Sequence, residues 1–273
     1  MERSAVTSGS GIVVKIGGSV LAPKSDSQLR VDQELLERMA KELAAVPVRP
    51  LVLVHGAGSY GHQIVNRTGL HRGLSGPESR LAMGETQRLQ HVLNCQVTEA
   101  LLRAGVPVMP LQASAMASLR DGVLQQMDLS VLEGLVSRGL VPLLYGVPAL
   151  DLERGCSVLS GDVIAPHVAG QLRMSRLVHL TNVDGVFTAD PSLQPNAERV
   201  SRITQRSWGR IRPLLAGSRE VDVTGGMAGK VTGLVKLAGL GIVSYIVSAR
   251  ISGRLAAALA DEDVGTRVCW EEE

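Results

Sequence analysis

Short apolar runs alternate with amphipathic segments along most of the chain. Nearly uninterrupted apolar runs predict buried strands at 11–16, 51–54, 106–111, 140–145, 177–181, 242–247 and 266–269. Apolar residues at helical spacing predict helices at 31–43, 77–104, 130–138, 161–172, 228–238 and 253–260. Segments 119–126 and 149–158 have turn residues at their centres and predict β-hairpins. Because strands alternate with helices, we expect an α/β fold in which helices cover both faces of a parallel sheet.

The composition excludes several classes of protein. A chain of 273 residues, 45% of them hydrophobic and 2% aromatic, fits one large domain or two closely joined lobes with an aliphatic core. A net charge of +2 and few aromatic residues give no support for nucleic-acid binding. The cysteines Cys95, Cys156 and Cys269 have no metal-ligand spacing and favour a reducing compartment. Residues 1–10 predict a flexible polar tail, and no apolar run approaches the ~20 residues of a membrane span. We therefore expect a cytoplasmic protein that interacts with neither nucleic acid nor membranes.

A glycine-rich loop follows the predicted strand at 51–54, and it reads His55-Gly56-Ala57-Gly58-Ser59-Tyr60-Gly61-His62. Its glycines allow sharp turns that expose backbone N–H groups, and consecutive N–H groups form a concavity for anions. We interpret the loop as a site for the phosphate of a small acceptor, with His62 in contact with that phosphate. His55 fits either a structural or a functional role. His167 and His179 have no motif around them and are expected to be structural.

The lysines mark a second group of candidate residues. Lys15 lies at the end of an apolar strand before Gly17-Gly18, where a charge is costly unless it is paired with a carboxylate or a bound polyphosphate. The alternative is an edge strand whose lysine reaches solvent. Lys24, in a polar loop, reads by itself as a surface lysine.

Two helix starts carry further candidates. Lys230 follows the segment Thr224-Gly225-Gly226-Met227, where a helix N-terminus would favour a nucleotide phosphate, or where Thr224 simply caps the helix and the lysine is exposed. Asp162 follows Ser160-Gly161 and is either part of a helix cap or an anchor for a lysine ammonium.

These motifs together resemble the amino acid kinase superfamily and, within it, the isopentenyl phosphate kinase family. The resemblance extends from about residue 11 to residue 268, with the motifs in the same order and spacing. The loop that ends at His62 is its most specific part. Acetylglutamate and uridylate kinases lack this histidine, and fosfomycin kinase has a similar one in a less similar loop. The motifs that carry the resemblance are Lys15-x-Gly17-Gly18-Ser19, Lys24, 55–62, Ser160-Gly161-Asp162, 182–186 and 223–230.

The resemblance implies a three-layer sandwich with an open, mainly parallel sheet. Residues 11–170 would form the lobe that binds the acceptor phosphate, and residues 171–273 the lobe that binds ATP. The reaction would be phosphorylation of isopentenyl phosphate by ATP. Mg²⁺ would bridge ATP oxygens and need few protein ligands, and the chain would form a homodimer.

The resemblance also implies residue roles. Lys15 would contact the transferring phosphoryl group, Asp162 would orient Lys15, and Lys24 and Lys230 would neutralise charge in the transition state. His62 would hydrogen-bond the acceptor phosphate. The other ATP-binding residues would be Gly17, Gly18, Asp184 and Gly226, and the other acceptor-binding residues Gly56, Ala57, Gly58, Gly161, Leu81 and Met83.

One segment departs from the family pattern, because the helix expected to line the acceptor tail is aliphatic here. Glu85 lies four residues from both Leu81 and Leu89, which predicts a place on the apolar face. A salt bridge to Arg72 or Arg80 is the preferred explanation, and a Glu85 that faces the pocket is the alternative. Other functions remain open, namely a kinase for another small phosphate or phosphonate such as fosfomycin, or a non-catalytic nucleotide-binding protein. The joint presence of the lysines, His62 and Asp162 argues against the last.

Overall fold

The computed structural model describes residues 11–23, 29–46, 50–191, 193–194, 196–215 and 226–270. An eight-stranded sheet forms its centre, in the order β12-β14-β13-β9-β1-β2-β6-β3. Most neighbours are parallel, whereas β14 runs antiparallel to β13. The mainly parallel sheet predicted from the sequence is thus confirmed. The strands are β1 (Ile12–Ile16), β2 (Leu51–His55), β3 (Val108–Pro110), β6 (Val141–Tyr145), β9 (Arg176–Thr181), β12 (Arg202–Ile203), β13 (Val243–Ser248) and β14 (Thr266–Val268).

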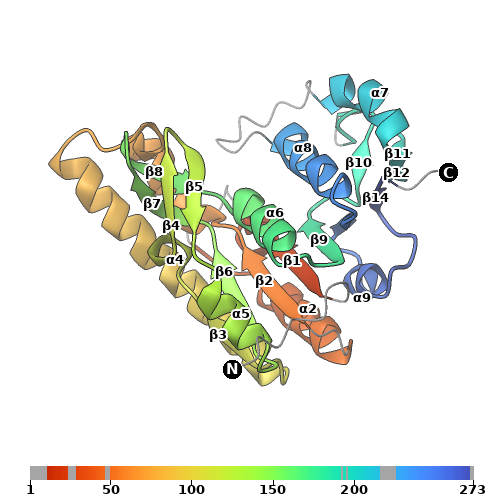
Figure 1. The fold of residues 1–273 in the computed structure, drawn as a ribbon, viewed down its shortest axis with the longest axis horizontal. Coiled ribbons are helices and arrows are strands. Elements are labelled where there is room, and N and C mark those ends of the chain that lie inside the picture. Colours follow the sequence, from red (N-terminus) through yellow and green to blue (C-terminus); the bar gives the residue numbers. More distant parts are fainter. Residues whose placement is uncertain are drawn as a thin grey trace.

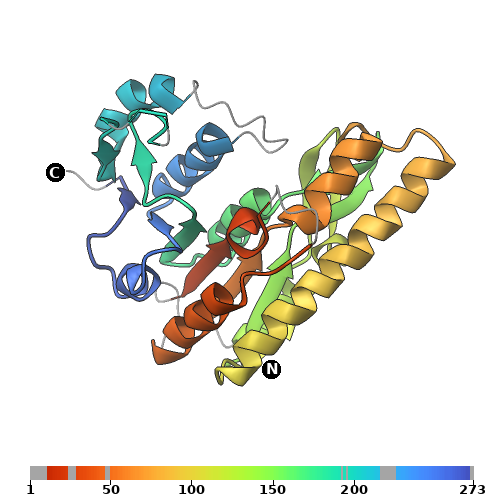
Figure 2. The same ribbon diagram turned by 180° about the vertical axis from the view of Figure 1, so that it is seen from behind.

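Helices cover both faces of this sheet. Figure 1 shows α5 (Ser130–Val136), α6 (Gly161–Gln171) and α8 (Gly226–Ala238) across one face. Figure 2 shows the opposite face, which is covered by α2 (Gln33–Ala45) and α4 (Pro77–Arg103). The short helix α9 (Arg254–Leu259) packs with α2 on that second face.

Each central strand supplies residues to two apolar cores. Val13 and Val54 pack with the α6 and α8 side, whereas Val14, Ile16 and Leu53 pack with the α2 and α4 side. Every residue of β1 and β2 is buried. Strands covered on both faces must be apolar on both faces, which is why continuous apolar runs identified them in the sequence.

A smaller sheet of two hairpins lies beside the first, in the order β5-β4-β7-β8. Both hairpins agree with the sequence prediction. The carboxylate of Asp151 accepts backbone N–H groups from both turns and the hydroxyl of Ser157. Burial opposes ionisation of Asp151, but these hydrogen bonds outweigh it and hold its pKa well below the usual range. The strands are β4 (Ala117–Arg120), β5 (Val123–Met127), β7 (Val147–Asp151) and β8 (Gly155–Leu159).

Two longer helices were not predicted, α3 (Ser59–Thr68) and α7 (Gln205–Leu215). The first begins inside the glycine-rich loop and the second contains Gly209 and Pro213, so neither shows an uninterrupted helical pattern. No helix in the described ranges is both long and apolar enough to cross a bilayer. The expected tail at 1–10 lies outside them. The remaining elements are α1 (Gly18–Leu21), η1 (Leu70–Arg72), η2 (Ala113–Ala115), β10 (Val186–Phe187) and β11 (Arg199–Val200).

Candidate active site

A cavity of about 650 Å³ lies at the carboxyl ends of the central strands. It is lined by Gly17 after β1, Gly56 after β2, Gly146 after β6 and Asn182 after β9. Ligands of open α/β sheets bind at this edge, because the loops that follow parallel strands meet there. The motifs that the sequence singled out therefore converge on one cavity.

Two glycine-rich turns meet in direct backbone contact on the floor of this cavity. A Cβ atom on Gly18 would lie 2.2 Å from the backbone nitrogen of Gly58, and one on Gly56 would lie 2.6 Å from the nitrogen of Gly18. Real Cβ atoms do not approach a backbone this closely. Gly58 also has a φ of +53°, which favours glycine. The glycines are therefore required for the close packing of the two turns.

Several helix N-termini point at the same cavity. His62 lies in the first turns of α3, Gly161 begins α6, and Met227 lies in the first turn of α8, and all three residues line the cavity. The Asp162 N–H donates to Ser160 Oγ at 3.1 Å, which caps α6. Unpaired N–H groups and the helix dipole make such N-termini favourable for anions. Their convergence predicts a site for more than one phosphate group.

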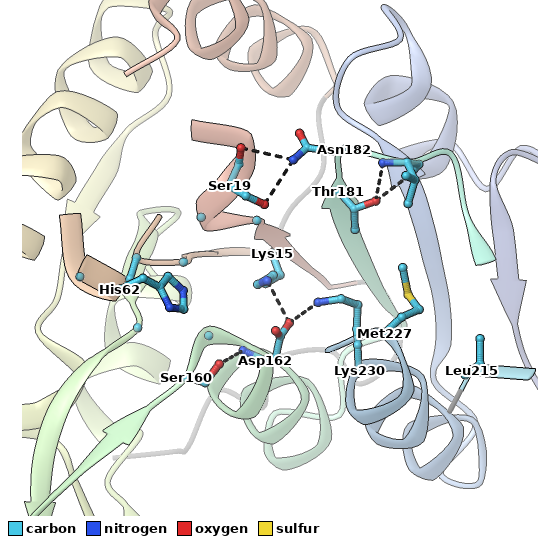
Figure 3. A pocket seen from close by; sticks show the side chains of 18 of the residues that line it. Lys15, Ser19, His62, Ser160, Asp162, Thr181, Asn182, Leu215, Met227 and Lys230 are labelled. Atoms are coloured by element: carbon cyan, nitrogen blue, oxygen red, sulfur yellow. Dashed lines mark hydrogen bonds and ion pairs between the residues drawn. The ribbon is translucent and has the colours of Figure 1, made fainter. Parts of the chain in front are cut away.

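Two lysines from different halves of the chain share one carboxylate oxygen. Asp162 Oδ1 lies 2.9 Å from Lys15 Nζ and 2.7 Å from Lys230 Nζ, as Figure 3 shows. Lys15 comes from β1 and is only 5% exposed. The alternatives of a solvent-reaching Lys15, an exposed Lys230 and an Asp162 that serves only as a cap are therefore wrong.

The cluster carries an excess positive charge in a buried setting. Burial opposes ionisation of Asp162, but the two lysines and His179 hold its pKa far below the usual range. Burial lowers the pKa of Lys230 to about 8, and the charge of Lys15 adds to this effect against the opposing attraction of Asp162. One carboxylate thus does not compensate two ammonium groups, and a bound polyphosphate would do so.

Apolar surface extends to either side of the lysines. Figure 3 shows His62 on one side of Lys15, and Met227 and Leu215 on the other. The His62 side includes Val65 of α3 and residues of β7 and β8, whereas the other side is formed by residues that follow β9. Asn182 donates to the backbone oxygen and the hydroxyl of Ser19, both at 3.3 Å, and joins the two halves above the cluster. The apolar lining on the two sides comprises Val65, Val147, Pro148 and Val158, and Phe187, Leu193, Leu214, Leu215 and Met227.

Two histidines occupy places that the sequence did not resolve. His55 is buried, lies 3.1 Å from Asn94 Oδ1 through Nε2, and stacks on the Tyr145 ring, which supports the structural alternative. His179 is also buried, but its Nδ1 lies 3.7 Å from Asp162 Oδ1. It stands opposite Lys15 in the pairing of β1 with β9. Register between distant strands cannot be read from one sequence, so no signal marked His179.

Some predicted residues lie elsewhere. Leu81 is 76% exposed and does not line the cavity, and Met83 packs behind it with Val65 and Leu70, so their expected direct contact with an acceptor is not seen. Asp184 was expected beside the nucleotide. Its carboxylate instead binds Arg199 and Arg254, both at 2.9 Å, and it does not line the cavity.

Glu85 also differs from the prediction. It is exposed and pairs with Arg88 at 2.7 Å, so both the expected apolar position and the expected salt bridge to Arg72 or Arg80 are wrong. The buried face of α4 instead includes Thr86 and Gln90, and both line the cavity. Lys24 lies outside the described residues, as do Thr224 and Gly225, while Gly226 begins α8.

Comparison with known proteins agrees with this geometry. The model of the amino acid kinase family matches residues 10–248. The chain belongs to this family. Among its relatives, the isopentenyl phosphate kinase of Methanothermobacter thermautotrophicus is 35% identical over 94% of this chain and 98% of that protein. A crystal structure of isopentenyl phosphate kinase superposes with a TM-score of 0.82 at 32% identity, covering 94% of this chain and 99% of the other. A more distant family member, the glutamate 5-kinase of Myxococcus xanthus, is 28% identical over 97% of this chain and 68% of that protein.

Proposed function

We propose that the chain transfers the γ-phosphoryl group of ATP to isopentenyl phosphate, which gives isopentenyl diphosphate and ADP. An oxygen of the acceptor phosphate forms a bond to the γ-phosphorus, and the bond from that phosphorus to the β,γ-bridging oxygen breaks. The observation that carries the proposal is the Lys15–Asp162–Lys230 cluster, which lies between a histidine-bearing glycine loop and a second apolar recess. The isopentenyl phosphate kinases among the relatives support the choice of acceptor.

The first half of the chain supplies the acceptor side. The N–H groups of Ala57 and Gly58, just before α3, would hold the acceptor phosphate, and His62 would donate a hydrogen bond to it. The N–H group of Gly56 instead donates to the backbone oxygen of Ile16 at 2.9 Å. Val65 and Val158 would contact the hydrocarbon tail. Leu70 and Cys156 are buried behind these two valines, which favours a short tail over a long one.

The second half of the chain supplies the donor side. We infer that the recess beyond Lys230, which includes Phe187 and Leu215, takes the nucleoside of ATP, with the N–H group of Gly18 on its phosphates. The N–H group of Gly17, also predicted to bind ATP phosphates, instead donates to the backbone oxygen of Leu180 at 2.9 Å. We therefore propose an acceptor lobe at 11–170 and an ATP lobe at 171–273, with Gly18 reaching the ATP phosphates from the acceptor lobe.

Charge neutralisation and positioning account for the chemistry. Transfer between two phosphates brings anions together, and Lys15 and Lys230 would offset that charge where the γ-phosphoryl group passes. An acceptor phosphate is already nucleophilic, so His62 serves as a hydrogen-bond donor and not as a base.

Mg²⁺ has no built protein site among the described residues, where no group of three metal-ligating side chains occurs. Asp162 is moreover occupied by two lysines. We infer that the oxygens of ATP would hold Mg²⁺, which would offset phosphate charge there.

We also propose a homodimer. Its support is a group of apolar side chains on α4 and β3 that are exposed in the single chain, namely Val92, Leu102 and Met109. Light scattering during size-exclusion chromatography gives the molar mass of the protein. A molar mass equal to that of one chain would exclude the dimer.

The activity is tested by a coupled ADP-release assay with isopentenyl phosphate, dimethylallyl phosphate, fosfomycin and UMP in parallel. Turnover of isopentenyl phosphate with the highest kcat/KM supports the proposal. Turnover of fosfomycin or UMP alone overturns it.

A further inference from the structure

His179 lies in the innermost layer of the site, beneath the lysines. It is fully buried in the middle of β9, and its side chain lies on the same face of the sheet as that of Lys15, its pairing partner in β1. Neither ring nitrogen has a hydrogen-bond partner within the described residues. A buried imidazole without a partner is costly, because its polar atoms have lost water and gained nothing.

The groups that surround the ring leave it one polar partner. β1 contributes Lys15, α8 contributes Lys230, and both, while protonated, are hydrogen-bond donors with no capacity to accept. β13 contributes the apolar Ile246 at the paired position. α6 contributes Asp162, whose Oδ1 lies 3.7 Å from His179 Nδ1. The carboxylate is therefore the acceptor within reach, and it lies just beyond hydrogen-bond distance.

Asp162 Oδ1 already accepts from both lysines. The function proposed above, on which this step rests, turns both ammonium groups toward transferring phosphates. Each ammonium that turns away removes a donor from a carboxylate whose side chain is only 16% exposed. A buried carboxylate that loses its donors would destabilise the state in which the lysines engage phosphate.

We propose that His179 is a positioning residue that donates its Nδ1–H to Asp162 Oδ1 when the lysines engage phosphate. The carboxylate is then held in place between the two lysines throughout transfer. The ring acts as a neutral donor: burial holds the pKa of His179 well below its ordinary value, and the charges of Lys230 and Lys15 lower it further against the attraction of Asp162. His179 contacts no substrate in this scheme and acts through Asp162.

Two substitutions separate this role from packing. His179→Asn retains an N–H near the position of Nδ1, whereas His179→Leu fills similar volume without a donor. We expect the leucine variant to lose kcat by about 10–100-fold, as is typical when the partner of a site residue is removed, with KM for both substrates changed by less than about 3-fold. The asparagine variant should keep kcat within about 3-fold of the parent. His167→Leu, which removes a histidine of α6 that does not line the cavity, is the matched control and should behave as the parent.

A spectroscopic measurement keeps the test independent of the acceptor and of activity. Long-range ¹H–¹⁵N spectra of the full chain report which ring nitrogen carries the proton. We expect the neutral Nδ1–H form of His179, and a shift of Nδ1 when a non-hydrolysable ATP analogue is added. Parental kcat in the leucine variant overturns the proposal, as does equal loss in both variants at unchanged melting temperature, or an Nε2–H ring in the complex. A parent that fails to phosphorylate isopentenyl phosphate refutes the proposed function instead and leaves the spectroscopic result to stand by itself.

Discussion

Replacement of Asp162 by asparagine removes the charge that two buried ammonium groups share. The cluster of Lys15, Asp162 and Lys230 then changes from a net charge of +1 to +2, since one carboxylate is lost and both lysines remain. Removal of one partner from a buried ion pair costs about 3–5 kcal/mol. For a domain of this size that corresponds to a fall in melting temperature of roughly 6–20 °C. The pKa of Lys230, already lowered to about 8, should fall further, because the attraction of Asp162 is the force that opposes burial.

Thermal unfolding with and without ATP is the assay for this variant. A polyphosphate brings the negative charge that asparagine lacks, so ATP should raise the melting temperature of Asp162→Asn by more than it raises that of the parent. Asp121→Asn is the matched control, because that side chain is 70% exposed in its pair with Arg154 and its loss should leave the melting temperature nearly unchanged. A melting temperature for Asp162→Asn equal to that of the parent would refute the reasoning. So would an ATP-induced increase no larger than the parental one.

Further predictions concern the loop, the turn and pH. His62→Ala should lower kcat/KM for isopentenyl phosphate by ~10²–10³ while calorimetry still detects ATP binding, and parental kinetics would remove His62 from the site. Gly18→Ala should destabilise the chain by about 1–3 kcal/mol and reduce kcat. The control Gly84→Ala, which has open space around its Cβ, should have the parental melting temperature or a higher one. Equal melting temperatures for the two variants would contradict the close packing of the turns. The kcat/KM for ATP should fall as pH rises through about 8, because Lys230 loses its proton there. Lys230→Arg should move this fall in kcat/KM to higher pH, because a guanidinium keeps its proton. If the fall stays at the same pH, another group causes it.

The sequence predicted the central strands well, because burial on both faces leaves a pattern that needs no knowledge of neighbours. Lys15 was the exception within such a run, and the structure explains it through Asp162. The convergence of Gly17, Gly56 and Gly161 followed from the rule that ligands bind beyond the carboxyl ends of parallel strands.

Side-chain direction on the long helix α4 was not predictable in the same way. Its apolar residues do not form one clear stripe, and its buried face includes Thr86, Gln90 and Asn94. Counting apolar positions therefore assigned Leu81 and Glu85 to the wrong face. The partners of Asp184 were not predictable for a related reason, since Arg199 and Arg254 come from segments distant in sequence.

The contact between Gly18 and the loop at 56–58 has a consequence for how this family changes its substrates. Main chain touches main chain there, so under the proposed function the span between donor and acceptor phosphates would be set by peptide geometry and not by any side chain. Residues that shape the acceptor recess, such as Val65 and Val158, lie outside that contact. Substitution of Val65 or Val158 can therefore change which acceptor fits, while the distance between the two phosphate sites stays the same.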